Sequence, residues 1–413
     1  MENTSIRRIL LIAGEYPPYM FGGGATFMYH LSRGLSKKGF NVSVVALKLA
    51  PRLATEIYIE NVDSKLKVIR ISIPSFAYPR HEFFQLRARH IVSKLIRTHN
   101  IIHMNTGLYY PWLRSIIKHS NKPTVITIHG DPISVLKISL SHPVTTYGNK
   151  IYDLLYMIEV RQALRKEVEE LYPVFVSKSV YETLKNVFNI MHYSIVYNGI
   201  DFDYINSALK SRSHSTLYNM IYSAKKRGFR ILIYVARFHP IKNHIALLPL
   251  LHHLIKRGVK VLLVLIGEGP LKNFIQQKAT RMNISQFIVF TGVLPNDEVL
   301  RLLSLADLVV FPSLYEAHPI SVIEALYLNK PVITFDLLYV RELYEVCKEL
   351  QLVKTVNNFS MFISKTFEML TSNRDFDHNL NIKTHECLLE KFGVNNMVRS
   401  YIELYNRINL ENQ

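Results

Sequence analysis

Short apolar runs alternate with amphipathic stretches along nearly the whole chain, and this alternation constrains the fold more than any other feature. The apolar runs have the length of strands, and stretches between them, such as Ala25–Lys38, have helical periodicity. Alternating strand and helix signals are typical of α/β domains built on parallel sheets. We predict one series of strands at Arg8–Ala13, Asn41–Leu47, Lys67–Ile73, Ile101–Met104, Thr124–His129 and Val174–Val176, and a second at Arg230–Val235, Val259–Ile266, Ile288–Thr291, Leu308–Phe311 and Val332–Thr334.

The two series are separated by a turn signal at Asn198–Gly199 and a polar stretch at Lys210–Thr216. From about Phe359 onward the pattern is helical. We predict two doubly wound, Rossmann-like domains over residues 1–200 and 201–395, and a C-terminal helix over 396–413 that packs back on the first domain. Ligands bind such sheets at the carboxyl ends of the strands, so a cleft between the two domains is the expected site.

Length and hydropathy indicate a soluble, cytoplasmic protein. The chain has 413 residues, of which 48% are hydrophobic, enough for two large cores. Its longest apolar runs, such as Val261–Ile266, are far shorter than the ~20 residues of a membrane-spanning helix. The apolar run Ile9–Ala13 is too short for the core of a signal peptide. The two cysteines, Cys347 and Cys387, predict neither a disulfide framework nor a metal site.

The charge of the chain points to an anionic partner. The formal net charge is +18, and residues 1–200 contain 25 basic and 13 acidic side chains against 25 and 19 in the remainder. A membrane surface, a phosphorylated substrate or a nucleic acid would suit this excess, and solubility alone is the alternative.

Two loops after predicted strands have the composition of phosphate-binding segments. The first contains Gly22–Gly24 just before a helix, where glycine allows close approach of backbone to phosphate. The second places Arg237 and Lys242 five residues apart, so that a guanidinium fork and an ammonium can hold a diphosphate from two sides. The alternative for the first segment is a loop that needs glycine only for a positive φ. The alternative for the second is an ordinary solvated start of a helix.

The strongest local signal runs from Pro312 to Leu326. Pro319 fits the first position of a helix, which would leave the N–H groups of Ile320 and Ser321 free to bind an anion. Glu316 and Glu324 would then lie on the order of 10 Å apart, at ~1.5 Å rise per residue. That separation suits contacts with opposite ends of one extended ligand.

Ordered motifs over residues 8–345 resemble those of retaining GT-B glycosyltransferases of the family 4 (group 1) class. The motifs are the Glu316–Glu324 pair with seven residues between, Arg237 with Lys242, Gly267–Leu271, Thr291–Leu294, Ala306–Asp307, Lys330–Ile333, Val196–Asp201, Gly23–Gly24 and Gly39–Val42. The resemblance implies a GT-B fold, an α/β architecture with two Rossmann-like domains facing a central cleft.

The resemblance also implies roles for individual residues. Arg237 and Lys242 would bind the donor diphosphate, Glu316 the donor-sugar hydroxyls, and Glu324 the ribose diol. The amides of Ile320 and Ser321 would hold the β-phosphate, and the backbone around Val293 would meet the base. His129 would lie beside the reacting sugar, and Gly23 and Gly24 against the phosphates and acceptor. The set is thus catalytic residues His129, Arg237, Lys242 and Glu316 with donor-binding residues Gly23, Gly24, Val293, Ile320, Ser321 and Glu324.

The implied reaction transfers a sugar, typically a hexose, from a nucleotide sugar to a hydroxyl acceptor with retention of anomeric configuration. No metal ion or other cofactor is expected, because the two cations can neutralise the diphosphate. Three departures from the family pattern border the sugar pocket: Ala317–Pro319 where relatives have Gly-aromatic-Gly, Phe335–Val340 without a glycine pair, and Asn329 where glycine is frequent. They leave the donor sugar open.

The acceptor is expected on the basic N-terminal half, as a glycan or a lipid-linked molecule. In Arg80–Asn100, a basic stripe (Arg87, His90, Lys94 and Arg97) runs beside an apolar one (Phe84, Ala88, Ile91 and Leu95). Such a helix can dock on anionic headgroups at the inner face of the cell membrane, and an ordinary solvated helix is the alternative.

Two other functions fit parts of the sequence. A DNA-modifying glycosyltransferase would suit the charge, but no nucleic-acid recognition motif stands out, so a nucleic-acid partner is not expected. A non-catalytic binding protein on the same fold would not need Arg237, Lys242, Glu316 and Glu324 together.

Overall fold

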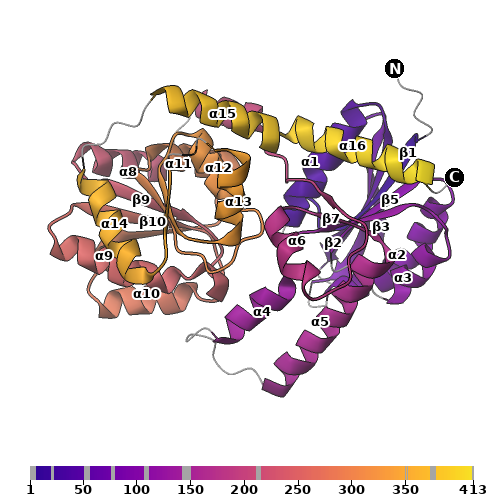
Figure 1. The fold of residues 1–413 in the computed structure, drawn as a ribbon, viewed down its shortest axis with the longest axis horizontal. Coiled ribbons are helices and arrows are strands. Elements are labelled where there is room, and N and C mark those ends of the chain that lie inside the picture. Colours follow the sequence, from indigo (N-terminus) through magenta and orange to yellow (C-terminus); the bar gives the residue numbers. More distant parts are fainter. Residues whose placement is uncertain are drawn as a thin grey trace. The chain divides into compact units, whose positions relative to one another are not determined.

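A computed structural model describes residues 6–19, 23–50, 56–75, 80–106, 111–141, 150–210, 215–348, 350, 352–372 and 378–411. The chain forms two compact units (Figure 1). The first comprises Met1–Ile133, Ile151–Ile200 and Phe392–Gln413, and the second comprises Ser134–Lys150 and Asp201–Lys391. The chain therefore leaves the first unit twice, over Ser134–Lys150 and over Asp201–Lys391, and returns to it at Ile151 and at Phe392.

An eight-stranded sheet forms the centre of the first unit, in the order β3-β4-β2-β1-β5-β6-β7-β8. Only β3 is antiparallel to its neighbour among these described strands. The strands are β1 (Arg8–Gly14), β2 (Asn41–Ala50), β3 (Ile57–Asn61), β4 (Leu66–Pro74), β5 (Ile101–Asn105), β6 (Thr124–Ile128), β7 (Tyr172–Phe175) and β8 (Ser194–Ile195). The sequence did not predict β3 and β8: all of β3 is exposed, so it lacks a buried apolar run, and β8 has only two residues.

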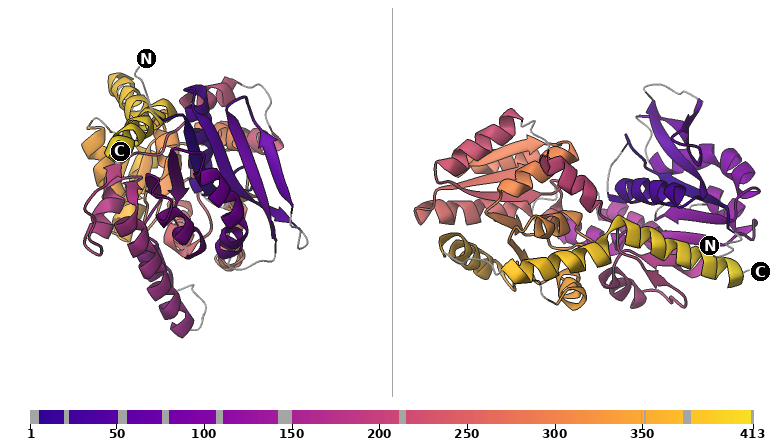
Figure 2. Two further views of the ribbon diagram at one scale, coloured as in Figure 1. Left: turned by 90° about the vertical axis from the view of Figure 1, so that its right-hand side faces the viewer. Right: turned by 90° about the horizontal axis from the view of Figure 1, so that it is seen from above.

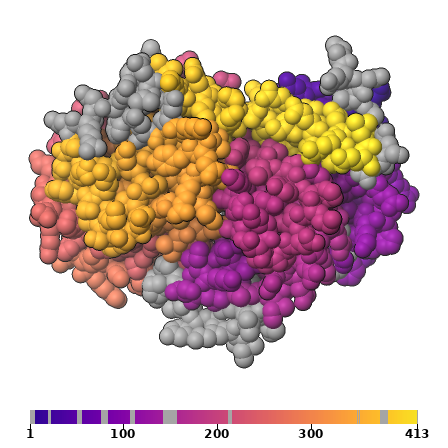
Figure 3. Space-filling model, viewed as in Figure 1, coloured from indigo at the N-terminus to yellow at the C-terminus, as the bar shows by residue number. Residues whose placement is uncertain are grey.

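Helices cover both faces of this sheet. They are α1 (Gly23–Lys37), α2 (Arg80–Ile96), α3 (Pro111–Lys118), α5 (Lys150–Glu170), α6 (Lys178–Lys185) and α16 (Val394–Glu411), and α4 (Pro132–Ser141) follows β6 in the chain. On one face, α1 and α16 lie side by side over a common core (Figure 2, right). Gly34 permits this approach, because a Cβ at that position would lie 2.2 Å from Val398 Cγ2. The outer side of α16 lies at the molecular surface (Figure 3, yellow).

Helix α2 differs from its predicted arrangement. Its buried apolar residues recur every four positions, at Phe84, Ala88, Val92 and Ile96, and they face β4. Ile91 and Leu95 are half-buried. The predicted apolar stripe therefore cannot enter a lipid layer, because Phe84 and Ala88 already belong to the core. Arg87 Nη1 donates a hydrogen bond to the Ser72 carbonyl (2.6 Å), which leaves His90, Lys94 and Arg97 as the exposed basic residues.

The second unit contains a fully parallel six-stranded sheet in the order β11-β10-β9-β12-β13-β14. The strands are β9 (Arg230–Val235), β10 (Val261–Ile266), β11 (Ile288–Gly292), β12 (Leu308–Phe311), β13 (Val332–Phe335) and β14 (Val353–Val356); β14 was not predicted. Its helices are α7 (Phe202–Lys210), α8 (Thr216–Lys226), α9 (Leu247–Lys256), α10 (Lys272–Arg281), α11 (Asn296–Leu305), α12 (Ile320–Tyr327), α13 (Leu338–Val346), α14 (Phe359–Thr371) and α15 (His378–Phe392).

The two cysteines form a disulfide, contrary to the sequence-based expectation. Cys347 follows α13 and Cys387 lies in α15, with 5.9 Å between their Cα atoms. Forty positions of sequence separate them, so only the fold reveals their proximity. Among the described helices, none combines the length and the apolar character that a bilayer span requires.

Candidate active site

Two strand ends and the start of α1 bring His129, Asn105 and Gly24 together in the first unit. His129 follows β6, Asn105 ends β5, and Gly24 lies in the first turn of α1. The amide of Asn105 bonds to both neighbours: Oδ1 lies 3.0 Å from His129 Nε2, and Nδ2 donates to the Gly24 carbonyl at 3.3 Å. A Cβ on Gly24 would lie 3.3 Å from Asn105 Nδ2, whereas Gly23 faces open space and Gly22 lies outside the described residues.

Burial keeps the imidazole of His129 neutral. It lowers the pKa of His129 to about 4. The ring packs edge-on against Phe27, with 4.9 Å between centroids. Since Asn105 Oδ1 can only accept, His129 carries its proton on Nε2 and presents Nδ1 as an acceptor. The group can therefore accept a hydrogen bond from a sugar hydroxyl at neutral pH.

A buried hydrogen-bond network connects this region to the C-terminal helix. His103 Nδ1 lies 2.5 Å from the hydroxyl of Tyr405, and its Nε2 lies 2.7 Å from Thr127 Oγ1. Thr127 Oγ1 in turn lies 2.8 Å from the Tyr401 hydroxyl. Both tyrosines belong to α16, and the ring of Phe27 packs against both Tyr401 and His129, so this helix supports His129 through Phe27.

In the second unit, the loop that carries Arg237 is held by the glycine motif after β10. Gly267 and Gly269 have φ of 140° and 156°, and a Cβ on either would lie within 3 Å of backbone atoms at Ala236 or Phe238. Phe238 N donates to the Glu268 carbonyl (3.0 Å), and Leu271 N donates to the Phe238 carbonyl (3.1 Å). The motif therefore fixes the backbone on both sides of the exposed Arg237.

Lys242 and Glu316 form an ion pair at the same edge of the sheet. Lys242 Nζ lies 2.5 Å from Glu316 Oε1, and the Glu316 side chain is 6% exposed against 22% for Lys242. Behind them, the buried Tyr234 hydroxyl donates to the Lys242 carbonyl (2.9 Å) and lies 2.8 Å from Ser313 Oγ. Burial, with the charge of Glu316, raises the pKa of Tyr234 well above its usual value. An ammonium has three N–H donors, so Lys242 can hold Glu316 and still bind a phosphate oxygen.

Helix α12 begins one residue later than predicted. Pro319 is its N-cap, with φ −75° and ψ 96°, so Ile320 and Ser321 are the first two helical residues. Val322 N donates to the Pro319 carbonyl (3.1 Å), but the N–H groups of Ile320 and Ser321 make no hydrogen bond to a described residue. They are oriented for an anion at the positive end of the helix dipole.

Glu324 is buried in the second turn of α12 rather than exposed on its surface. Its side chain is among the buried charged residues, and burial raises its pKa to about 7. Just after the same helix, Asn329 has φ of 56°, in the left-handed region that glycine adopts most easily. This conformation is consistent with the glycine that is frequent at this position in glycosyltransferases of the family 4 class.

Val293 follows Gly292 at the end of β11, and its side chain is 76% exposed. Gly267 N donates to the Gly292 carbonyl (3.0 Å), so this loop adjoins the glycine motif.

The predicted site residues divide between the two units. The first unit contains Gly23, Gly24 and His129, and the second contains Arg237, Lys242, Val293, Glu316, Ile320, Ser321 and Glu324. Sequence reasoning missed Asn105, although a polar residue that ends a buried strand was the available signal.

Two glycosyltransferase family models together match most of the chain. Residues 21–204 match the model described as Glycosyltransferase Family 4, and residues 220–380 match the model described as Glycosyl transferases group 1. No curated protein sequence matches the chain.

Solved structures of low sequence identity share the fold over nearly their full length. Sucrose-phosphate synthase from Thermosynechococcus elongatus has a TM-score of 0.77 at 16% identity, over 98% of this chain and 100% of that chain. The Anabaena protein HepE, in complex with UDP and glucose, has a TM-score of 0.69 at 13% identity, over 97% and 100%. The catalytic domain of starch synthase IV from Arabidopsis thaliana, bound to ADP and acarbose, has a TM-score of 0.66 at 13% identity, over 98% and 99%. The fold is GT-B.

Proposed function

We propose that this chain, which is a glycosyltransferase of the GT-B type, transfers a hexose from a nucleotide sugar to a hydroxyl of a glycan or lipid-linked acceptor and retains the anomeric configuration. The observation that carries the proposal is the Lys242–Glu316 pair, which joins the loop after β9 to the segment that enters α12. Cation, carboxylate and free helix amides thereby meet at one edge of one sheet. A sugar diphosphate offers the matching groups, two phosphates and a ring of hydroxyls.

The second unit holds the donor. Lys242 and Arg237 bind the diphosphate, and the amides of Ile320 and Ser321 bind its β-phosphate. Glu316 accepts hydrogen bonds from donor-sugar hydroxyls, because the ion pair with Lys242 holds its carboxylate in place. Glu324 accepts from the ribose diol, and the backbone at Val293 contacts the base. The complexes of HepE with UDP and glucose, and of starch synthase IV with ADP, support a nucleotide donor.

The first unit holds the acceptor and one side of the reacting sugar. His129 Nδ1 accepts a hydrogen bond from a sugar hydroxyl. Gly24 leaves room beside the imidazole, because a Cβ there would lie 3.6 Å from His129 Cδ2, and Gly23 contacts the phosphates and the acceptor. The bond from the anomeric carbon to the phosphate oxygen breaks as the acceptor oxygen attacks from the same face. Because the acceptor attacks on the face from which the phosphate departs, configuration is retained, and the leaving phosphate takes the acceptor proton. The protein contributes orientation and charge stabilisation.

In this proposal Arg237 and Lys242 neutralise the leaving diphosphate, and no metal ion takes part. Their two charges suffice for a nucleoside diphosphate that departs with about the charge it already carried. Among the described residues, no three His, Cys, Asp or Glu side chains gather as metal ligands. EDTA should therefore leave activity unchanged, and restoration of activity by added Mg²⁺ or Mn²⁺ would contradict this point.

A lipid-linked acceptor places the protein at the inner face of the cell membrane. The support is electrostatic: His90, Lys94 and Arg97 are exposed on α2, and the apolar side of this helix belongs to the core. Binding to vesicles with anionic lipids should be strong at low salt and lost at high salt. Equal binding to neutral vesicles, or none to anionic ones, would contradict it.

The donor is tested by thermal unfolding with UDP-, GDP-, ADP- and dTDP-sugars. A ligand at 100 times its dissociation constant adds about 2.7 kcal/mol, which shifts a midpoint by several degrees. We expect a shift with one nucleotide, lost in Arg237→Ala/Lys242→Ala and kept in Arg281→Ala, which removes an exposed charge from the same unit. Because Lys242→Ala leaves Glu316 buried without its cation, Arg237→Ala alone is the second variant. A shift unchanged in both variants would overturn the proposed donor site.

A further inference from the structure

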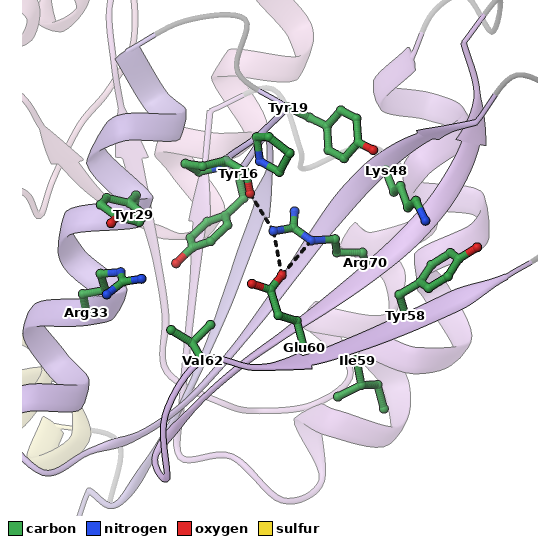
Figure 4. A pocket seen from close by; sticks show the side chains of 12 residues that line it. Tyr16, Tyr19, Tyr29, Arg33, Lys48, Tyr58, Ile59, Glu60, Val62 and Arg70 are labelled. Carbon is green, nitrogen blue, oxygen red and sulfur yellow. Dashed lines mark hydrogen bonds and ion pairs between the residues drawn. The ribbon is translucent and has the colours of Figure 1, made fainter. Parts of the chain in front are cut away.

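A pocket of about 670 Å³ opens on the first unit, on the α1 side of strands β2, β3 and β4 (Figure 4). It is separate from the residues assigned above. Four tyrosines dominate its wall, from the segment after β1, from α1 and from β3. The lining consists of Tyr16, Pro17, Pro18, Tyr19, Tyr29, Arg33, Lys48, Tyr58, Ile59, Glu60, Val62 and Arg70. We call it the tyrosine pocket.

Two cations in the tyrosine pocket rest on aromatic rings. Lys48 Nζ lies 3.2 Å from the ring centroid of Tyr58, and the Arg33 guanidinium carbon lies 4.8 Å from that of Tyr29. Neither forms a salt bridge with a described carboxylate. A ring holds a cation in place without cancelling its charge, so both keep N–H donors for an anion.

The third cation, Arg70, is part of the floor. It is 8% exposed, and its Nε and Nη2 donate to Glu60 Oε2 at 3.1 and 2.9 Å. Nη2 also donates to the Pro17 carbonyl at 2.6 Å, which ties the segment after β1 to the sheet. Nη1 is buried, has no hydrogen-bond partner among the residues that the structure describes, and points away from Glu60 (Figure 4).

The lining of the tyrosine pocket has a net positive charge. It contains three cations, Arg33, Lys48 and Arg70, and one carboxylate, Glu60. Tyrosine faces are electron-rich and suit the C–H groups of a flat sugar ring, while the phenol hydroxyls bond to sugar hydroxyls. The volume lies within the range of ordinary small-ligand pockets.

We propose that the tyrosine pocket binds a sugar that carries a negative charge, either a phosphate or a carboxylate. The ring stacks on the tyrosine wall, and the charges of Arg33 and Lys48 attract the anionic group. This site lies entirely within the first unit, and the inference does not depend on the proposed donor site.

Isothermal titration of the full chain tests the site with four probes: glucose 6-phosphate, glucuronic acid, glucose and inorganic phosphate. We expect one or both charged sugars to bind at least tenfold more tightly than glucose or phosphate. The tighter of the two identifies the anionic group. In Arg33→Gln/Lys48→Gln the dissociation constant of that sugar should rise at least tenfold. In Lys37→Gln/Lys38→Gln, which removes two exposed charges from the end of α1 and the turn after it, it should stay the same.

Two further variants separate this site from the alternatives. Tyr19→Ala, in the segment after β1, removes a wall ring that holds none of the described cations, so it should weaken the charged sugar and leave inorganic phosphate unaffected. Arg237→Ala should leave charged-sugar binding unchanged, since it belongs to the donor loop. The proposal is overturned if phosphate binds as tightly as glucose 6-phosphate, if neither charged sugar binds, or if Arg33→Gln/Lys48→Gln has no effect. Preference for a short single-stranded oligonucleotide over both charged sugars would also overturn it.

Discussion

The tautomer of His129 depends on one neighbouring amide. Asn105 offers His129 Nε2 a neutral acceptor at 3.0 Å, and its own Nδ2 is committed to the Gly24 carbonyl. These two bonds fix the side-chain orientation of Asn105 and therefore the proton of His129. A carboxylate at this position would preserve the shape and change the charge.

We predict that Asn105→Asp raises the pKa of His129 above its value of about 4, because an adjacent negative charge favours the imidazolium. Titration of the His129 Cε1 proton by NMR measures this pKa. Asn105→Ala removes the amide without adding charge and should produce no comparable rise. An unchanged pKa in Asn105→Asp would show that the two side chains are not in contact.

Glu324 makes stability depend on pH in a definite direction. Burial raises its pKa from 4.5 to about 7, so the folded state holds this proton more tightly than the unfolded state. The resulting stabilisation is complete below pH 4.5 and is lost as the pH rises to about 7. Glu324→Gln cannot titrate, so its stability relative to the parent should increase between pH 5 and pH 8, by up to about 3 kcal/mol.

Urea unfolding at the two pH values checks this prediction. Glu386→Gln, at an exposed carboxylate in α15 of the same unit, is the control. A difference between Glu324→Gln and the parent that stays constant from pH 5 to pH 8 would contradict the burial of an ionisable Glu324.

At the scale of elements, the loop after β9, which carries Arg237, packs against the glycine motif after β10. Gly269 has φ of 156°, and a Cβ there would lie 2.6 to 2.9 Å from three backbone atoms of Phe238. No flexible side chain can move aside to make room. The glycine motif is therefore a support for the Arg237 loop.

We predict that Gly269→Ala displaces this loop and destabilises the protein by roughly 1–3 kcal/mol, the usual cost of a strained backbone position. Nucleotide affinity should fall by tenfold or more, although residue 269 contacts no ligand in the proposal. Gly258→Ala is the matched control, because its φ is also positive (77°) but a Cβ there meets nothing within 4 Å. Equal losses of nucleotide affinity in both variants would contradict a specific supporting role.

At the scale of the whole molecule, the sequence predicted the α/β class and most central strands because buried parallel strands are continuous apolar runs. Strand β3 was not predicted because its five residues are exposed and form no buried apolar run. The disulfide was not predicted because 40 positions separate its two cysteines. For α2, the amphipathic pattern was correct but the buried stripe was assigned to Ile91 and Leu95 instead of Val92 and Ile96.

The candidate site was predictable where residues follow one another in the chain and not where contacts join distant segments. Glu316, Ile320, Ser321 and Glu324 fall on one strand-to-helix segment, which periodicity locates. The ion pair between Lys242 and Glu316, by contrast, spans 74 positions and needs the order of β9 and β12 in the sheet. The tyrosine pocket likewise collects residues from five segments, none of which has a distinctive motif.

The most direct test of the central claim is release of sugar from a nucleotide sugar, followed by ¹H NMR from the first minutes. We predict that, in a panel of UDP-, GDP-, ADP- and dTDP-α-hexoses, one donor yields nucleoside diphosphate and a free hexose that is first observed as the α anomer. This release should be lost in Arg237→Ala/Lys242→Ala and kept in Arg281→Ala. Release of the β anomer first would contradict retention, and the absence of release from every donor, with or without added glycans, would contradict glycosyl transfer by this chain.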